Sequence, residues 1–190
     1  MRNSNFIQLD KRFLMRWSPR SFEPNPIDEK DLLSLFEAAR WAPSCFNEQP
    51  WVFVYAKSEK DKINFQNILN EGNQIWANNA PVLVAVFSKR HFEKNGKENR
   101  WSEFDCGAAW MSITLQALSL GIYCHGMAGY DPQKAYATCK VDPLKFNSVC
   151  MIALGKMGPP EKLPEPVRSR EFPSDRKELK KVAFEGSFTE

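Results

Sequence analysis

Arg16-Trp17-Ser18-Pro19-Arg20 places two arginines on either side of a serine, in a segment that a proline stiffens. The residue before a proline is disfavoured in the helical region, so a helix arriving from the N-terminus ends before Pro19. Guanidinium groups match phosphate and carboxylate oxygens with paired hydrogen bonds. The stretch is therefore predicted to hold an anion in extended chain, just before the first long helix.

A second polar stretch, residues 41–51, reads Trp-Ala-Pro-Ser-Cys-Phe-Asn-Glu-Gln-Pro-Trp. It follows a predicted helix that begins after the N-cap Asp28, and it leads into an apolar strand at residues 51–56. The amides of Asn47 and Gln49 can both donate and accept hydrogen bonds, so this loop suits a heterocyclic ligand. The alternative is a capping loop whose polar side chains bond its own backbone.

Composition points to a soluble globular chain, with 43% hydrophobic and 26% charged residues. The net charge of +3 arises in residues 1–20, because the rest of the chain is slightly negative. A local cationic segment argues against a nucleic-acid-binding protein. Fourteen Phe and six Trp exceed the needs of such a core, which leaves aromatic surface for a pocket or a subunit interface.

The cysteines indicate a reducing, cytoplasmic setting, because they are odd in number and form no CxxC pair: Cys45, Cys106, Cys124, Cys139 and Cys150. Cys45 is a candidate nucleophile, but the sequence identifies no histidine base for it, so a bystander thiol is the other reading. With two histidines, no metal-site spacing occurs and no metal is expected. No apolar run approaches the roughly 18 residues of a membrane span.

Apolar runs and amphipathic patterns interleave along the chain, which predicts an α/β or α+β class in one layered domain spanning residues 1–190. Strands are expected at residues 51–56, 82–87, 122–129 and 148–154. Helices are expected within residues 6–20 and at residues 28–41, 59–69, 104–120 and 132–139, while residues 71–79 suit a loop or a short helix. Residues 88–102 are charged and rich in turn formers, which is typical of an exposed excursion or a lid.

Prolines accumulate near the C-terminal end, so residues 155–190 are predicted to form an extended arm without regular helix rather than a second domain. In extended chain, Arg168 and Arg170 project to the same side. If this pair meets the Arg16–Arg20 segment, the four arginines form a phosphate clamp; the alternative is that they are solvated surface residues. Residues 180–184 suit an edge strand, added to this sheet or to that of another subunit.

Residues 121–129 (Gly-Ile-Tyr-Cys-His-Gly-Met-Ala-Gly) would let the backbone approach a planar ligand closely. They do not form GxGxxG, and GxxxxGK[ST], GxSxG and HExxH are absent from the sequence. Common nucleotide, hydrolase and metalloprotease sites are therefore unsupported, and His125 is expected to be structural. The residues alone indicate an anion-holding segment and a polar loop, without naming an activity.

Seven short motifs follow one another along nearly the whole chain: Arg16-x-Ser18-x-Arg20-x-Phe22; Ala38-Ala39-Arg40-x-Ala42-Pro43-Ser44-x-x-Asn47-x-Gln49-Pro50-Trp51; Ala80-Pro81; Ala117-Leu118-x-Leu120-Gly121; Gly129-Tyr130-Asp131; Ile152-Ala153-Leu154-Gly155; and Arg168-x-Arg170. In this order they resemble the FMN-dependent nitroreductase family. The resemblance implies an α+β homodimer, a three-layer α/β/α sandwich with a mostly antiparallel central sheet and an extended C-terminal arm. It also implies FMN as the cofactor, bound at the subunit interface, with NAD(P)H as the electron donor.

The resemblance implies roles for individual residues at that cofactor. The phosphate would be held by Arg16, Ser18, Arg168 and Arg170, with Trp17 beside them. Arg20 would lie near the N1/O2 edge of the flavin, where positive charge favours the anionic reduced form. The remaining contacts would come from Pro43, Ser44, Cys45 and Asn47 of the partner subunit, with Gln49 in the same motif, from Asn73 at the pyrimidine ring, and from the backbone amides of Met127, Ala128 and Gly129 at N5 and O4.

The family's reaction is ping-pong. NAD(P)H gives a hydride to flavin N5 and departs, and a small-molecule acceptor such as a nitroaromatic, a quinone or an enone then takes the electrons. No side chain is assigned as catalytic. Some members carry a lysine beside flavin N1 where this chain has Trp76, which is expected to alter the flavin potential or to stack on the ring.

Two other functions remain open at this point. The first is a flavin-binding relative without turnover, acting as a flavin store or a partner-binding module. The second is a small basic nucleic-acid-binding protein, against which the uneven charge distribution argues. Neither a nucleic acid nor a membrane is expected as a partner of this chain.

Overall fold

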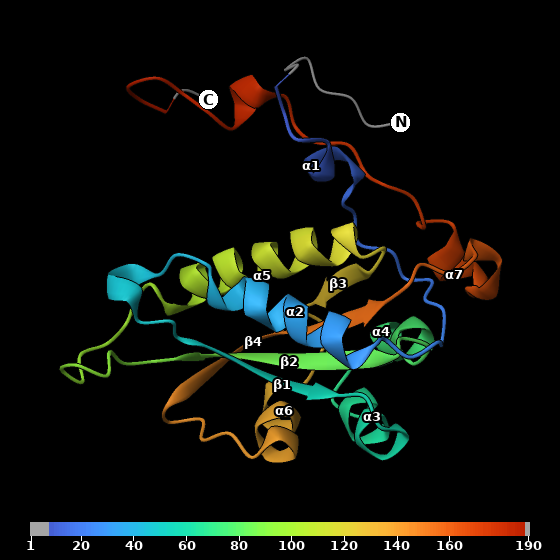
Figure 1. Ribbon diagram of the computed structural model, residues 1–190, viewed down its shortest axis with the longest axis horizontal. Helices are drawn as coiled ribbons and strands as arrows, with labels where there is room; N and C mark the ends of the chain where they lie inside the picture. The colour runs from blue at the N-terminus through green and yellow to red at the C-terminus, as the bar shows by residue number, and fades with distance from the viewer. Residues whose placement is uncertain (1–7, 189–190) are drawn as a thin grey trace.

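The computed structural model describes residues 8–188. Its centre is an antiparallel sheet with the strand order β1-β2-β4-β3 (Figure 1). The strands span Trp51–Ala56 (β1), Val82–Lys89 (β2), Tyr123–Met127 (β3) and Phe146–Gly155 (β4). All four strands predicted from sequence are confirmed. β2 and β4 are central and apolar, and their pairing shifts register once, between Val86 and Phe87.

Two long helices, α2 (Glu29–Arg40) and α5 (Ser102–Ser119), cover one face of the sheet. α2 begins where the Asp28 side chain accepts a hydrogen bond from Lys30 N at 2.8 Å. α5 ends where Gly121 adopts φ +68°, a left-handed conformation that glycine allows without strain. Buried leucine, isoleucine and alanine side chains of the two helices pack on the valines of β2.

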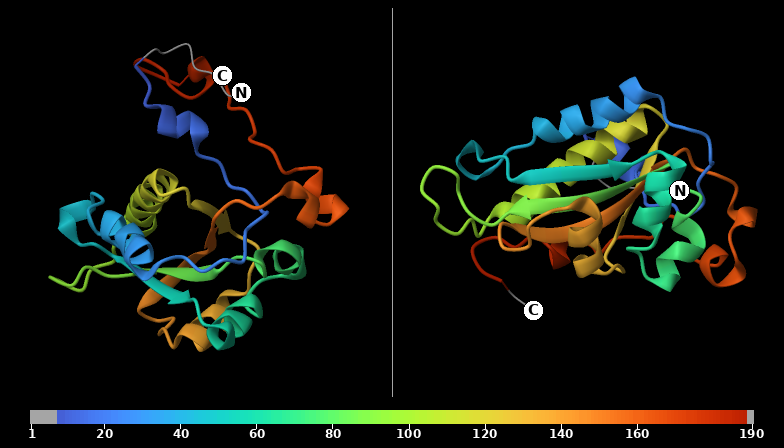
Figure 2. Two further views of the ribbon diagram at one scale, coloured as in Figure 1. Left: turned by 45° about the vertical axis from the view of Figure 1, so that its right-hand side comes forward. Right: turned by 90° about the horizontal axis from the view of Figure 1, so that it is seen from below.

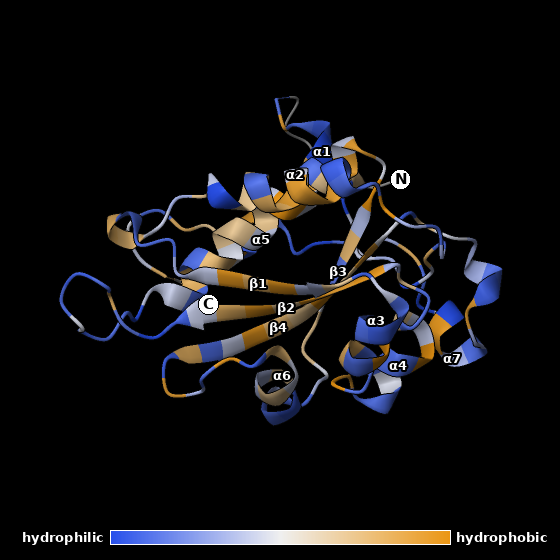
Figure 3. Cartoon of the chain, turned by 60° about the horizontal axis from the view of Figure 1, so that its bottom comes forward, coloured by the Kyte–Doolittle hydropathy of each residue, from blue (hydrophilic) through white to orange (hydrophobic). Residues whose placement is uncertain are grey.

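Three shorter helices cover the other face: α3 (Glu59–Gln66), α4 (Glu71–Ala77) and α6 (Pro132–Cys139). Each begins at a capping side chain, namely Ser58, Asn70 and Asp131. Residues 71–79, for which a loop or a short helix was expected, therefore form a helix. Figure 3 shows the hydrophobic strands between the two helical layers, which confirms the predicted three-layer α/β/α arrangement.

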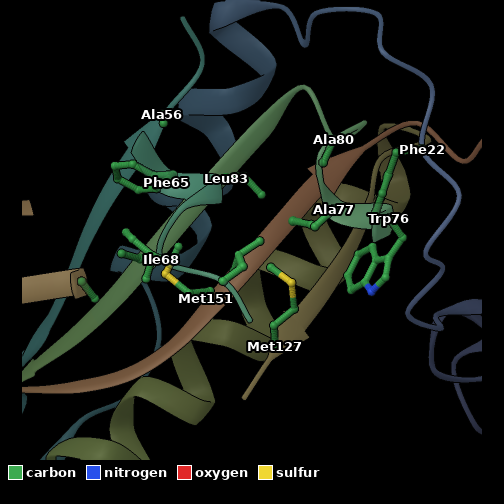
Figure 4. Packing of buried hydrophobic residues seen from close by; sticks show 14 of the residues in the cluster. Phe22, Ala56, Phe65, Ile68, Trp76, Ala77, Ala80, Leu83, Met127 and Met151 are labelled. Carbon is green, nitrogen blue, oxygen red and sulfur yellow. The ribbon is translucent and has the colours of Figure 1, made fainter. Parts of the chain in front are cut away.

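Trp76 of α4 belongs to the hydrophobic core on the face of the sheet that α3, α4 and α6 cover, and it is 2% exposed. Its ring packs against Phe22, with ring centroids 6.3 Å apart (Figure 4). Phe22 in turn forms a β-bridge with Met157, just beyond the end of β4. The core thus reaches the segment that carries the N-terminal arginines.

The predicted helix within residues 6–20 is wrong in extent. Residues 1–7 lie outside the described part of the chain, and α1 spans only Lys11–Met15. Leu9 and Phe13 are 39% and 46% exposed, so the expected apolar stripe is only partly covered within the described chain. A helix without such packing is not extended by propensity alone.

The C-terminal segment contains more local structure than its prolines predicted. It forms two 3-10 turns, η2 (Pro160–Lys162) and η3 (Leu179–Lys181), and the short helix α7 (Glu165–Arg168). Proline is tolerated in a first turn, where its missing N–H has no partner to lose. The expected edge strand at residues 180–184 is also wrong, because η3 occupies its start. Figures 1 and 2 show residues 8–18 and 172–188 leaving the layered body on the same side.

Within residues 8–188, no helix combines the length and the apolar character needed to cross a membrane.

Candidate functional site

The arginine segment is fixed to the end of the sheet by backbone contacts. Beyond the Phe22–Met157 bridge, Ser21 accepts a hydrogen bond from Gly158 N at 2.9 Å through its carbonyl oxygen. The Ser21 hydroxyl donates to the carbonyl of Pro159 at 2.7 Å. Residues 16–20 are therefore held in extended chain beside the end of β4, as the proline in this stretch predicted.

His125 of β3 contacts the same segment through a hydrogen bond to its backbone. Its Nδ1 lies 2.9 Å from the carbonyl oxygen of Pro19, and its ring centroid lies 4.6 Å from that of Trp76. Because a carbonyl oxygen only accepts, Nδ1 carries the proton and donates it. Burial lowers the pKa of His125 to about 4, and the nearby Arg20 and Arg16 guanidiniums contribute in the same direction. The structural role expected for this histidine fits these contacts.

The buried neutral His125 is expected to make stability depend on pH. The pKa of His125 is lower in the folded protein than in the unfolded chain, so between about pH 6.5 and pH 4 the unfolded state binds the proton more strongly. The free energy of unfolding therefore decreases as the pH is lowered through this range. We expect the free energy of unfolding to decrease by about 2 kcal/mol more between pH 7 and pH 4.5 in wild type than in His125→Asn. Urea unfolding at pH 7 and at pH 4.5 measures the free energy of unfolding of wild type and of His125→Asn. His91→Asn, at an exposed histidine, is the control and should retain the wild-type pH dependence.

A pocket of about 330 Å³ opens beside this segment. Within the described chain its lining is strongly cationic, with four guanidinium side chains and two hydroxyls: Arg16, Trp17, Ser18, Arg20, His125, Arg170, Phe172, Ser174 and Arg176. Nη1 of Arg16 donates to the Ser18 hydroxyl oxygen at 3.4 Å, so these two polar side chains lie next to one another in the lining. The two arginine-bearing segments, which are far apart in sequence, therefore meet here as the clamp predicted.

Arg168 does not join this pocket. It ends α7 and pairs with Glu165 on the exposed side of that helix. The prediction that Arg168 and Arg170 project together from extended chain is wrong, because a helical turn rotates successive side chains to different sides. Arg176, which the sequence analysis overlooked, lines the pocket with Arg170.

Glu171 is a further residue that the sequence analysis missed. Its side chain is 1% exposed, and its carboxylate accepts the backbone N–H groups of Arg20 (2.8 and 3.1 Å) and Ser21 (2.9 Å). It also lies 4.0 Å from Nη1 of Arg20. Burial lowers the pKa of the Arg20 guanidinium, and Glu171 opposes that effect. A glutamate in a Pro- and Arg-rich tail gave no periodic signal by which to single it out.

The second polar stretch folds into a tight loop around η1 (Cys45–Asn47). Three of its residues, Phe46, Asn47 and Gln49, adopt positive φ of 53°, 57° and 51°, which non-glycine side chains disfavour. Such backbone strain persists only where surrounding contacts over-determine it. Here the Ser44 hydroxyl accepts Gln49 N at 3.0 Å, so part of the predicted self-capping is present.

Asp105 of α5 braces this loop and was also missed. Its carboxylate accepts Cys45 N at 3.1 Å, and the residue is 3% exposed. A pocket of about 210 Å³ lies beside it, lined mostly by apolar atoms: Pro43, Ser44, Cys45, Trp101, Phe104, Asp105 and Ala108. This pocket is lined by residues from the start of α5, whereas no residue of α5 lines the cationic pocket and the two pockets share no lining residue. Within the described chain, the two polar stretches therefore do not form one pocket.

The residues predicted around the pyrimidine ring form a compact cluster of their own. Nδ2 of Asn73 donates to the Gly129 carbonyl at 2.8 Å. A Cβ on Gly129 would lie 2.4 Å from the Asn70 amide and 2.7 Å from the Asn73 amide, so only glycine fits there. Met127 is buried, while Ala128 is exposed at the end of β3. Asn73 therefore acts on this loop through Gly129.

Trp76 is buried beneath His125 rather than on the pocket wall. Of the two roles expected for it, direct stacking on a ligand would require it to leave the core.

The cysteines other than Cys45 are buried or half-buried. Burial raises the pKa of Cys106 to about 12 and that of Cys139 to about 11, as expected for inert thiols.

A family model for the nitroreductase family matches residues 14–75 and 58–156. The chain belongs to this family. A solved oxidoreductase containing FMN is 41% identical, with 99% of this chain and 96% of that chain covered and a TM-score of 0.94. A candidate NADH dehydrogenase/NAD(P)H nitroreductase of Ralstonia nicotianae is 29% identical over 150 residues, which cover 69% of this chain and 77% of that nitroreductase-family protein. The CLA biosynthesis enone reductase of Lactiplantibacillus plantarum is 26% identical over 177 residues, with 74% and 82% covered.

Proposed function

We propose that this nitroreductase-family chain is an FMN-dependent oxidoreductase that uses NAD(P)H to reduce nitroaromatics, quinones or related acceptors such as enones. The observation that carries the proposal is the cationic pocket, in which Arg16 and Arg170 converge beside Ser18 from opposite ends of the chain. Membership of the family and the similarity to an FMN-containing oxidoreductase support the same assignment.

The donor chemistry of the pocket fits FMN. A phosphate group needs several N–H and O–H donors, which guanidiniums and a serine hydroxyl provide. Nη1 of Arg16 donates to the Ser18 hydroxyl oxygen at 3.4 Å, so the two side chains lie together in one part of the pocket. Burial lowers the pKa of His125 to about 4, so this residue is neutral at physiological pH and the positive charge of the pocket comes from its arginines. Arg20 also lines the pocket, where its Nη1 contacts the Arg170 carbonyl, and it would provide the positive charge at the flavin edge.

The assignment of residues follows from that fit. Arg16, Ser18 and Arg170 would hold the phosphate, and Arg20 would face the N1/O2 edge. Arg168 is left out because Glu165 already occupies its guanidinium. Asn73 would act by fixing Gly129. The backbone amides of Met127, Ala128 and Gly129 would lie near N5 and O4.

A second copy of the chain completes this proposed site. The loop with Pro43, Ser44, Cys45, Asn47 and Gln49 lies at the far end of α5 from the arginines, so it would reach the cofactor only from a partner subunit. Large apolar side chains surround that loop without cover from this chain: Trp41 (74% exposed), Phe46 (90%), Trp101 (57%) and Phe104 (75%). Exposed apolar clusters of this kind are typical of subunit interfaces. A homodimer accounts for them.

When bound, FMN would supply the redox chemistry, accepting a hydride at N5 from NAD(P)H and delivering electrons to the acceptor in a second, ping-pong half-reaction. The chain's own residues bind and orient. The guanidinium of Arg20 would favour negative charge at the flavin edge. No side chain in the cationic pocket needs to transfer a proton for this scheme.

The visible spectrum of the purified protein, recorded under nitrogen, tests the proposal. We expect flavin absorption bands that bleach within seconds of adding NADH or NADPH and return when a quinone is added. Initial rates over a grid of donor and acceptor concentrations should give parallel double-reciprocal lines. A yellow protein that neither donor bleaches would identify a flavin store without turnover, and a colourless protein that binds no added FMN would refute the assignment altogether.

A further inference from the structure

Glu171 stands at the junction between the cationic pocket and the C-terminal segment. Its Oε1 accepts both Arg20 N (2.8 Å) and Ser21 N (2.9 Å), while Oε2 lies 3.1 Å from Arg20 N and 4.0 Å from Arg20 Nη1. With 1% of its side chain exposed, the carboxylate is shielded from water. Buried charges persist in proteins when they are paired and hydrogen-bonded, as this one is.

The contacts of Glu171 join two parts of the chain that are 150 residues apart. Arg20 also donates through Nη1 to the carbonyl of Arg170 at 3.5 Å. The position of Arg170 in the pocket and the path of residues 16–21 therefore depend on the same small cluster. A change at Glu171 acts on both walls of the pocket at once.

Charge gives Glu171 a second effect. Four guanidiniums line the pocket, and among its lining residues within the described chain there is no carboxylate. Glu171 lies directly behind Arg20 and reduces the positive potential that this guanidinium directs into the pocket. At partly buried sites such charge pairs are weakly screened, so the reduction is felt by any bound group.

We propose that Glu171 is a positioning residue of the cofactor site, which fixes the backbone of Arg20 and Ser21 and moderates the positive charge that Arg20 presents to the flavin. The inference rests on the proposed function and adds to it a residue that lies just after the Arg168-x-Arg170 motif and outside all seven family motifs. The two effects are separable. One needs an acceptor oxygen at Oε1, and the other needs the negative charge.

Glu171→Gln and Glu171→Ala separate them. Glutamine retains an acceptor oxygen for the two backbone N–H groups but lacks the charge, whereas alanine lacks both. Glu161→Gln and Glu161→Ala are the matched controls, because Glu161 is an exposed carboxylate on the same C-terminal segment that does not line the cationic pocket. All four variants are compared with wild type as full-length protein.

The readouts are the dissociation constant of oxidised FMN from the apoprotein and the midpoint potential of bound FMN. Without the carboxylate, reduced anionic flavin should be favoured, so Glu171→Gln should raise the midpoint potential. This corresponds to an increase of about fivefold in the affinity for reduced relative to oxidised FMN, the effect of one partly screened charge. Glu171→Ala should in addition raise the dissociation constant of oxidised FMN about tenfold, since two backbone donors lose their acceptor.

The two proposals fail in different ways. If wild type binds FMN but Glu171→Gln has the potential of Glu161→Gln, and Glu171→Ala binds FMN as tightly as Glu161→Ala, the role of Glu171 is refuted and the proposed function stands. If wild type binds no FMN, both are refuted. Circular dichroism of each variant establishes that it is folded, and Glu171→Gln, which keeps the backbone contacts, decides the charge effect even where Glu171→Ala does not fold.

Discussion

Replacing either Arg16 or Arg20 with alanine is expected to raise the dissociation constant of FMN about 10- to 100-fold, the range for losing a charge-assisted hydrogen bond. Both side chains line the cationic pocket, and Arg20 is anchored there through Glu171 and the carbonyl of Arg170. Purified variants should therefore carry much less flavin than wild type. Flavin released by heat denaturation, measured per chain from its absorbance, gives the occupancy directly.

The two variants should also differ from one another. Arg16→Ala removes a donor placed for the phosphate, so it should weaken riboflavin binding far less than FMN binding. Arg20→Ala removes charge from the flavin edge, so it should in addition lower the midpoint potential of whatever FMN remains bound. Arg12→Ala, at an exposed arginine paired with Asp10 outside the pocket, is the control and should retain full occupancy. Wild-type flavin content in both pocket variants would contradict the clamp.

The sequence predicted the strands and the layered class because those signals are local. The apolar run of β2 and the cap at Asp131 are each readable within a few residues, and both occur as expected. The arginine stretch was predicted in the same way, since Pro19 constrains its neighbour whatever the tertiary context. From the residues alone, its meeting with Arg170 was one of two alternatives, and the family resemblance implied it. In the structure, the contacts of Ser21 with Gly158 and Pro159 hold the two segments side by side.

Other features depend on contacts that no local pattern encodes. Glu171 and Asp105 are ordinary acidic residues in sequence, and they matter because each meets backbone donors from a remote segment. Arg168 was misplaced because α7 replaces the extended chain that its prolines indicated. The positive φ of Phe46 has no signature either, since glycine or asparagine is the usual indicator of that conformation. Contacts with residues distant in sequence, such as the one between Cys45 N and Asp105, stabilise such conformations.

Trp76 shows how a position aligned by a motif can change its role. Where some members of the family carry a lysine beside the flavin, this chain has an aromatic ring packed between Phe22 and His125. The residue is 2% exposed and lies beside Phe22 in the core (Figure 4). It connects the core to the arginine segment, because Phe22 forms a β-bridge with Met157. It therefore supplies packing energy, and in the proposed site the positive charge at the flavin edge would come from Arg20.

Trp76→Ala is accordingly expected to lower the free energy of unfolding by about 3–5 kcal/mol, the cost of emptying a large buried aromatic site. Trp76→Phe should cost much less, because most of the apolar volume is retained. Urea unfolding of the apoproteins measures both changes. Leu144→Ala, at an apolar side chain that is 81% exposed and lies outside both pockets, is the control and should change stability by less than about 1 kcal/mol.

Trp76→Phe distinguishes a packing role of Trp76 from a direct effect of its ring on the flavin. If Trp76 acts through packing, Trp76→Phe restores both stability and FMN affinity together, because His125 and Phe22 regain a ring to pack against. A flavin potential that shifts in Trp76→Phe while its stability equals that of wild type would instead show that the indole acts on the flavin directly. Equal stability of Trp76→Ala and Leu144→Ala would contradict the packing role of Trp76 and its part in supporting the arginine segment through Phe22 and His125.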